Sequence, residues 1–220
     1  METYFQRYVI EGGVMMIFLI PCSFFAVWFI FQGLINLRRS RIVPQNLLDR
    51  AEGVKSSKEF EDFMKALINS ASSLGNIFHW LFKGNFSPAT HISDEEVVDA
   101  IDDEISRLYH KNNQLAAIYT VSPLLGLLGT ILGMMKTFYV FALSEEHSIA
   151  QLSKGINEAL VTTMWGLMIA IPAYVALYFF RQRLFSYEMN LLPDAVRNIL
   201  RHMKSMEKTE VEDMRGKADE

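Results

Sequence analysis

Residues 124–135 read LLGLLGTILGMM and lie within an apolar run that extends over residues 115–143. Three of these twelve positions are glycine (Gly126, Gly129 and Gly133), and Thr130 places a hydroxyl group among them. Glycine in a helix interior costs about 1 kcal/mol relative to alanine in water. Its repetition in so hydrophobic a segment therefore indicates a role other than helix formation.

Small residues allow helix backbones to approach closely in lipid, where little hydrophobic driving force acts between helices. Gly129 and Gly133 form a G-x-x-x-G pair, and Gly126, Thr130, Gly133 and Thr137 lie within about 40° of one another on a helical wheel. This narrow face either packs against another helix or lines a tight passage. The G-x-x-x-G pair alone favours simple packing.

Three apolar blocks account for much of the chain, half of whose 220 residues are hydrophobic. Since about 20 apolar residues span a bilayer core, each block is long enough for a transmembrane helix. The sequence therefore predicts an all-α integral membrane protein in a lipid bilayer, with spans two and three extended into the cytoplasm as long helices. The predicted transmembrane helices are residues 14–37, 115–143 and 158–180.

Basic residues directly follow two of the spans. Arg38, Arg39 and Arg41 follow the first span, and Arg181 and Arg183 follow the third. Such residues collect on the cytoplasmic side of a membrane, so the N-terminus is expected to face outward and the C-terminus the cytoplasm. The remaining segments are then an outer arm (1–13), a cytoplasmic helical domain (38–114), an outer loop (144–157) and a cytoplasmic C-terminal helix and tail (181–220).

Several functional classes lack support in the sequence. The first block is longer than a signal-peptide core and lacks a basic segment before it, so we expect it to be retained. Cys22 is the single cysteine, which excludes an intramolecular disulfide. The histidines show no metal-ligand spacing, and no P-loop, nucleophile elbow or catalytic carboxylate pair is present. We expect no enzyme activity, no catalytic residue, no cofactor, no metal and no nucleic-acid partner.

The predicted cytoplasmic domain begins its last helix at a capping box, in which Ser93 is followed by Glu96. Apolar residues then recur at helical spacing, and no residue in 109–119 stops the helix before the second span. We expect one helix to run into the membrane, bent by Pro123. The predicted apolar stripe consists of Val97, Val98, Ile101, Ile105 and Leu108.

Two other segments are helical in pattern. The first segment is residues 58–82, which a loop over residues 83–90 follows. The second is the continuation of the third span past Arg183. The tail after Met206 is charged and is expected to fray.

The third span begins with Glu158, followed by Thr162 and Thr163, and contains Pro172 in its middle. Glu158 is open to two interpretations. It could be a helix-start acid at the headgroup level, or an ionisable group at membrane depth, which usually marks an ion path or a buried partner. Pro172 removes one backbone donor, so neighbouring helices or water must satisfy the carbonyl it leaves free.

The two segments SPLLGLLGTILGMMKTF (122–138) and GINEALVTTMWGLMIAIPAYVALYFF (155–180) together carry a resemblance. They are similar to the paired spans of the MotA/TolQ/ExbB proton-channel family, on the ExbB and TolQ side. In that family a P-x-x-G-L-x-G-T-x-x-G-M span precedes an I-x-E-A-L-x-x-T-x-x-G-L-x-x-A-I-P span. The first span and residues 42–110 contribute only their layout.

The resemblance implies a homo-oligomer, a pentamer in this family, around a dimer of an ExbD- or TolR-like single-span protein in the bacterial inner membrane. Proton flow would drive a TonB- or TolA-like protein. The implied proton pathway contains Thr130, Glu158 and Thr163, with Thr162 as an alternative. The residues expected to serve helix packing are Gly126, Gly129, Gly133, Gly166 and Pro172.

Two features depart from this pattern. Lys136 stands where a neutral residue is more common, and it either snorkels outward or reaches toward Glu158 as a carboxylate partner. Glu158 and Thr163 lie about 140° apart on a straight helix, so they cannot both face one narrow line. They face different partners, or Thr162 shares the role.

Two functions are compatible with these features. The first is a proton-channel subunit of an ExbB/TolQ-type motor that serves outer-membrane transport or envelope maintenance. The second is a non-conducting membrane scaffold, in which the small residues serve packing alone and the cytoplasmic domain recruits a partner.

Overall fold

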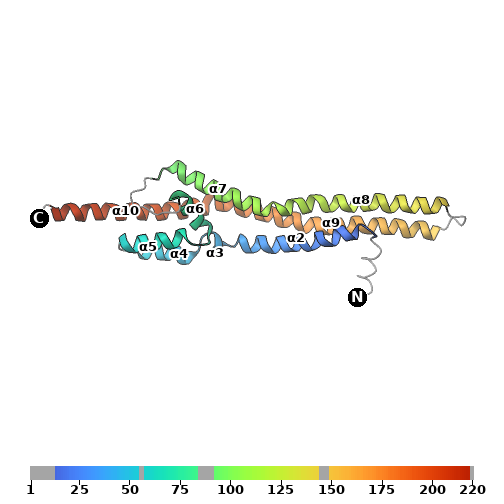
Figure 1. Ribbon diagram of the computed structural model, residues 1–220, viewed down its shortest axis with the longest axis horizontal. Coiled ribbons are helices and arrows are strands. Elements are labelled where there is room, and N and C mark those ends of the chain that lie inside the picture. Colours follow the sequence, from blue (N-terminus) through green and yellow to red (C-terminus); the bar gives the residue numbers. More distant parts are fainter. Residues whose placement is uncertain (1–12, 55–56, 84–91, 144–148, 219–220) are drawn as a thin grey trace. The chain divides into compact units, whose positions relative to one another are not determined.

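The computed structural model describes residues 13–54, 57–83, 92–143 and 149–218, and the regular elements in these ranges are all helical (Figure 1). They are α2 (Met16–Asn36), α3 (Arg39–Ile42), α4 (Gln45–Gly53), α5 (Ser57–Ile68), α6 (Ser73–Leu81), α7 (Asp94–Asn112), α8 (Gln114–Leu143), α9 (Ile149–Ser186), the π-helix η1 (Tyr187–Leu191) and α10 (Leu192–Ala218). Three helical stretches are long and apolar enough to cross a membrane. The first is α2 (Met16–Asn36), the second is Asp94–Leu143, which combines α7 and α8, and the third is Ile149–Ser205, which runs from α9 through η1 into α10. The all-α class and the three spans are thus confirmed.

The chain divides into two compact units. The apolar unit comprises Met1–Gly33 and Asn112–Phe179, and the polar unit comprises Leu34–Lys111 and Phe180–Glu220. The apolar unit therefore contains most of α2 and α9 and all of α8. The polar unit contains the short helices α3 to α6, nearly all of α7, η1 and α10.

The core of the apolar unit lies where α2 packs against α8 and α9. Its buried members are Met16, Leu19, Ala26 and Ile169, with Ile118, Leu125 and Trp165 partly buried against them. Large apolar side chains on the other faces of these helices remain exposed, among them Phe24, Ile131 and Ile171. Surfaces of this kind suit contact with lipid or with further helices.

The capping box of α7 is confirmed. The Glu96 N–H donates to the Ser93 hydroxyl at 3.2 Å, and the Ser93 N–H donates to the Glu96 carboxylate at 2.9 Å. Four residues of the predicted stripe are buried, but Val98 is 54% exposed, so its inclusion was wrong. Val98 directly follows Val97, and consecutive residues on a helix point about 100° apart.

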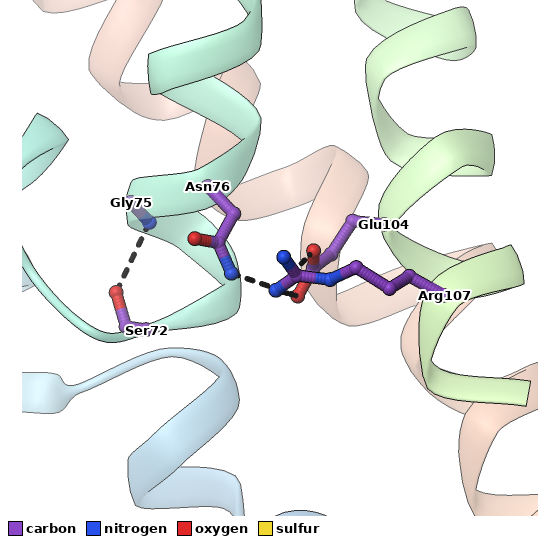
Figure 2. A network of polar contacts seen from close by, with 5 residues as sticks. All are labelled: Ser72, Gly75, Asn76, Glu104 and Arg107. Carbon is purple, nitrogen blue, oxygen red and sulfur yellow. Dashed lines mark hydrogen bonds and ion pairs between the residues drawn. The ribbon is translucent and has the colours of Figure 1, made fainter. Parts of the chain in front are cut away.

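A buried carboxylate joins α6 to α7 in the polar unit (Figure 2). Glu104 is only 3% exposed, and it accepts a hydrogen bond from Asn76 Nδ2 at 3.1 Å and forms an ion pair with Arg107 at 3.0 Å. At the start of α6, the Gly75 N–H donates to the Ser72 hydroxyl at 3.0 Å. A buried carboxylate is tolerated only with such partners, so these contacts fix α6 against α7.

The end of α2 is tied to the helix that continues from α9. Tyr187, the first residue of η1, donates its hydroxyl to the Leu37 carbonyl at 2.8 Å and accepts a hydrogen bond from Arg183 Nε at 2.8 Å. The last carbonyls of a helix lack intrahelical partners. The Tyr187 hydroxyl thus satisfies a carbonyl one residue beyond the end of α2.

The helix of the third span begins earlier than expected. α9 begins at Ile149, so residues 149–157, assigned above to a loop outside the membrane, are helical, and their place outside the membrane stays a prediction. Ile149, Leu152 and Ile156 continue the helical apolar spacing into that segment. Residues 144–148 lie outside the described part of the chain.

Two further differences concern the polar segments. The helix predicted to enter the second span is interrupted at Asn113, whose carbonyl accepts from the Ala116 N–H at 2.9 Å. The helical stretch 58–82 is broken between Ile68 and Ser73. α10 continues past Met206 to Ala218, and the expected fraying of this tail stays a prediction. Most of the loop predicted over residues 83–90 lies outside the described residues.

Candidate functional site

The site lies in the apolar unit, where α8 and α9 approach each other through glycine. A Cβ built on Gly126 would lie 3.0 Å from the Thr162 carbonyl oxygen and 3.1 Å from Thr163 Cα. A Cβ built on Gly166 would lie 2.6 Å from the Ser122 carbonyl oxygen. In both cases the nearest atoms belong to the facing backbone, which cannot move aside cheaply. The two helices therefore approach closely because these side chains are missing.

The same approach continues toward the later residues of α8. A Cβ on Gly129 would lie 2.6 Å from the Thr162 hydroxyl oxygen, and one on Gly133 would lie 3.1 Å from Ala159 Cβ. Gly155 extends the contact, since a Cβ there would overlap the hydroxyl oxygen of Thr137. The glycines named from sequence thus share one helix–helix contact, and Gly155 was missed because its segment was predicted to be a loop.

Three threonine hydroxyls gather around the Gly126 carbonyl. Its oxygen lies 3.2 Å from Thr130 Oγ1, 3.1 Å from Thr163 Oγ1 and 3.3 Å from Thr162 Oγ1. Thr130 and Thr163 also hydrogen-bond to each other across the two helices. We call Thr130, Thr162 and Thr163 the threonine cluster.

Proton counting limits how the cluster can be bonded, because each hydroxyl carries one proton. Thr162 donates to the Ala159 carbonyl at 2.7 Å, its shortest contact. In the Thr130–Thr163 pair, one hydroxyl donates to the other, and the second donates to a backbone carbonyl. Thr163 can reach the Gly126 oxygen, and Thr130 can reach the Gly126 or Ala159 oxygen at 3.2 Å. The pair therefore has two possible directions of donation.

Thr162 and Thr163 reach the same carbonyl although neighbouring helix residues point about 100° apart. The missing side chain at Gly126 lets the α8 backbone lie between them. Thr162 is 2% exposed, whereas Thr163 and Thr130 are partly exposed. Both threonines that the sequence left as alternatives therefore belong to the cluster.

Glu158 lies within α9 rather than at its start. Nine helical residues precede it, and the first turn of α9 contains no acidic residue. The interpretation of Glu158 as a helix-start acid is therefore wrong. Its side chain is half-buried and lies against Gly13, which precedes α2. Glu158 and Thr163 thus face different neighbours.

Lys136 and Pro172 lie at exposed positions of α8 and α9. Among the described residues no ion pair joins Lys136 to Glu158. Within the same ranges no group of His, Cys, Asp or Glu side chains is arranged to hold a metal ion. The roles expected for Lys136 and Pro172 remain predictions.

Ser122 and Gly13 were not named from the sequence as members of the site. Ser122 is fully buried, donates its hydroxyl to the Ile118 carbonyl at 2.8 Å, and has its own carbonyl against Gly166. Its position four residues before Gly126 could have indicated its place on this face. Gly13 is brought to Glu158 only by the packing of α2, which no local pattern reveals.

Comparison with known proteins gives a family match over the central part of the chain. The model of the MotA/TolQ/ExbB proton channel family matches residues 57–191. The chain is 40% identical over 80 residues to Biopolymer transport protein ExbB of Salmonella typhimurium, covering 36% of this chain and 33% of that protein. It is 38% identical over 77 residues to Tol-Pal system protein TolQ of Haemophilus influenzae, covering 35% and 34%. These alignments span about a third of the relatives' length.

A longer match at lower identity also exists. Biopolymer transport protein ExbB of Xanthomonas campestris is 28% identical over 141 residues, which is 61% of this chain and 55% of that protein.

Proposed function

Because the chain belongs to the MotA/TolQ/ExbB proton channel family, we propose that it is a proton-channel subunit of an ExbB/TolQ-type motor in a bacterial inner membrane. The proposed assembly is a pentamer of this chain around a dimer of an ExbD- or TolR-like single-span protein. Proton flow through it energises a TonB- or TolA-like protein. The N-terminus is periplasmic and the C-terminus cytoplasmic in this proposal, since the arginines follow the first and third spans.

The observation that carries the proposal is the threonine cluster on the α8–α9 contact. A hydroxyl is both donor and acceptor, so a Thr130–Thr163 pair with two directions of donation can accept a proton at one end and release one at the other. Polar groups in a membrane-spanning helix are costly and usually functional. Glu158, embedded in α9 nine residues after its start, supplies the ionisable group of the same helix.

The energy available from protons is sufficient for mechanical work. One elementary charge that crosses a potential of 100 mV releases about 2.3 kcal/mol. A few protons therefore supply enough free energy for a conformational step or a rotation of one subunit against another.

The competing function is a non-conducting scaffold, and the close glycine packing is compatible with it. In that case the threonine hydroxyls only satisfy backbone carbonyls between α8 and α9. The two functions differ in whether the assembled protein moves protons.

The test is proton flux. The full chain is co-purified with its single-span partner, reconstituted into lipid vesicles under a membrane potential, and monitored with an internal pH-sensitive dye. We expect flux above that of empty vesicles and a loss of flux in a Thr130→Val/Thr163→Val variant that still assembles. Flux equal to that of empty vesicles, from a complex that supports growth in cells, favours the scaffold.

A further inference from the structure

Gly13 and Glu158 are 145 positions apart in the sequence and lie against each other in the apolar unit. A Cβ built on Gly13 would overlap Oε1 of Glu158 and lie 3.3 Å from Cδ and 3.6 Å from Cγ. The whole outer part of the Glu158 side chain therefore lies over the Gly13 backbone. Only glycine leaves the Glu158 carboxylate in this place, because any Cβ at position 13 would push the flexible end of that side chain aside.

The backbone of Gly13 imposes the same choice independently. Its φ is +61°, in the left-handed region that residues with a Cβ rarely adopt. Gly13 is also where the chain enters α2, since its carbonyl accepts from the Met16 N–H at 3.2 Å. A conformational requirement and a spatial requirement thus coincide at one residue.

The carboxylate of Glu158 consequently lies at the N-terminal end of the first span. The first N–H groups of a helix lack intrahelical acceptors, and this end of the helix dipole favours negative charge. A carboxylate beside Gly13 therefore lies in a field that favours its charged form. A side chain at position 13 would move the carboxylate away from this place.

We propose that Gly13 is a positioning residue for Glu158, which holds the carboxylate against the start of α2. This inference rests on the proposed function, in which Glu158 takes part in proton transfer. It adds a residue at the entry to the first span, outside the stretch of residues 57–191 that the family model matches. It also couples the position of the first span to the ionisable group of the third.

The first experiment tests the contact without reference to proton transfer. Gly13→Cys and Glu158→Cys are combined in a Cys22→Ala full-length chain and oxidised in native membranes. We expect a reducible cross-link at the mass of a single chain. The matched control pairs Gly13→Cys with Met168→Cys, which lies ten residues, or about 15 Å, farther along α9. That pair should not cross-link, because a disulfide needs Cα atoms within about 7 Å.

The second experiment tests the positioning role. Gly13→Ala should reduce proton-driven flux about tenfold or more, because small displacements of a reacting group are costly. Glu158→Asp, which is shorter by one methylene, should lower flux in the native background but raise it in the Gly13→Ala background. Such a reversal would show that the length of the side chain at position 158 is matched to the space at position 13. If Gly13→Ala only disturbed the fold, Glu158→Asp would not restore flux.

Two controls separate the added Cβ from backbone strain. Gly13→Asn carries a Cβ but tolerates a left-handed φ, so it should lose flux as Gly13→Ala does. Gly53→Ala adds a Cβ where no atom lies within 4 Å and should have no effect on flux. Assembly yield is measured for every variant in the same membranes.

Three outcomes would overturn the inference: no cross-link between positions 13 and 158, full flux in Gly13→Ala, or no recovery on adding Glu158→Asp. Failure of the proposed function has a different signature. In that case Glu158→Gln retains full activity, while the cross-link still forms.

Discussion

The hydroxyl groups of Thr130 on α8 and Thr163 on α9 hydrogen-bond to each other across the helix contact. Both also lie within reach of the Gly126 carbonyl, at 3.2 Å and 3.1 Å. This pair is the point at which the glycine-based packing and the polar residues of the two helices coincide. Removing the two hydroxyl groups should therefore change both the stability of the helix contact and proton transport, and the two effects can be measured independently.

Thr130→Val and Thr163→Val keep the shape of the side chain and remove its hydroxyl. We expect the two changes to be coupled in a double-mutant cycle of unfolding in detergent, by about 0.6 kcal/mol and at most about 1.7 kcal/mol, the mean and the maximum found for hydrogen bonds between membrane helices. Thr130→Ser, which retains the hydroxyl, is the control and should keep proton-driven activity. Strictly additive effects would show that the hydroxyls do not form a pair.

Gly166→Ala should loosen the α8–α9 contact. The added Cβ would lie 2.6 Å from the Ser122 carbonyl oxygen, and overpacking of this kind costs about 1–3 kcal/mol. Thermal unfolding of the assembled protein measures the change. Gly53→Ala, with no atom within 4 Å, should be neutral or stabilising by up to about 1 kcal/mol. Equal behaviour of the two variants would contradict the packing account.

Asn76→Asp should destabilise the polar unit in a pH-dependent way, because it places a second carboxylate beside the buried Glu104. Like charges raise the pKa of a carboxyl group in the folded state above its unfolded value. The repulsion should therefore lower the free energy of unfolding of the variant only slightly near pH 4 and progressively more toward pH 7.5. Denaturant unfolding at several pH values measures this trend. Asn76→Leu is the control, and the loss it causes should not grow with pH in this way.

Tyr187→Phe should destabilise the polar unit by about 1–3 kcal/mol, because the buried Leu37 carbonyl and Arg183 lose their partner. The measurement is thermal unfolding of the full chain. Tyr139→Phe removes a hydroxyl from a side chain that is 69% exposed and should cost far less. Similar losses in both variants would mean that the Tyr187 hydroxyl bonds contribute little.

Local patterns predicted the elements whose causes are local. The lengths of the apolar blocks predicted three spans, because a span is defined by about 20 consecutive residues. The Ser93–Glu96 capping box formed as expected, because it depends on only four consecutive residues. Glycine spacing correctly placed Gly126, Gly129 and Gly133 on one contact face. Residues 149–157 were assigned to a loop, although Ile149, Leu152 and Ile156 continue the helical apolar spacing there.

Tertiary contacts could not be predicted in the same way. The sequence could not decide between Thr162 and Thr163, because a helical wheel takes no account of how closely the facing backbone approaches. Both reach the Gly126 carbonyl because no side chain separates the helices there. The contact of Gly13 with Glu158 depends on the packing of α2, so no pattern near either residue indicates it.

The Glu158→Gln variant tests the central claim, that this chain conducts protons, most directly. Glutamine retains the size and hydrogen bonding of glutamate but cannot carry the charge. Proton flux and complex yield are measured in the same reconstituted membranes, with Glu188→Gln of η1, outside the apolar unit, as the matched control. We predict normal assembly with flux reduced to the level of empty vesicles in Glu158→Gln, and unchanged flux in the control. Full flux from Glu158→Gln at normal yield would contradict the account.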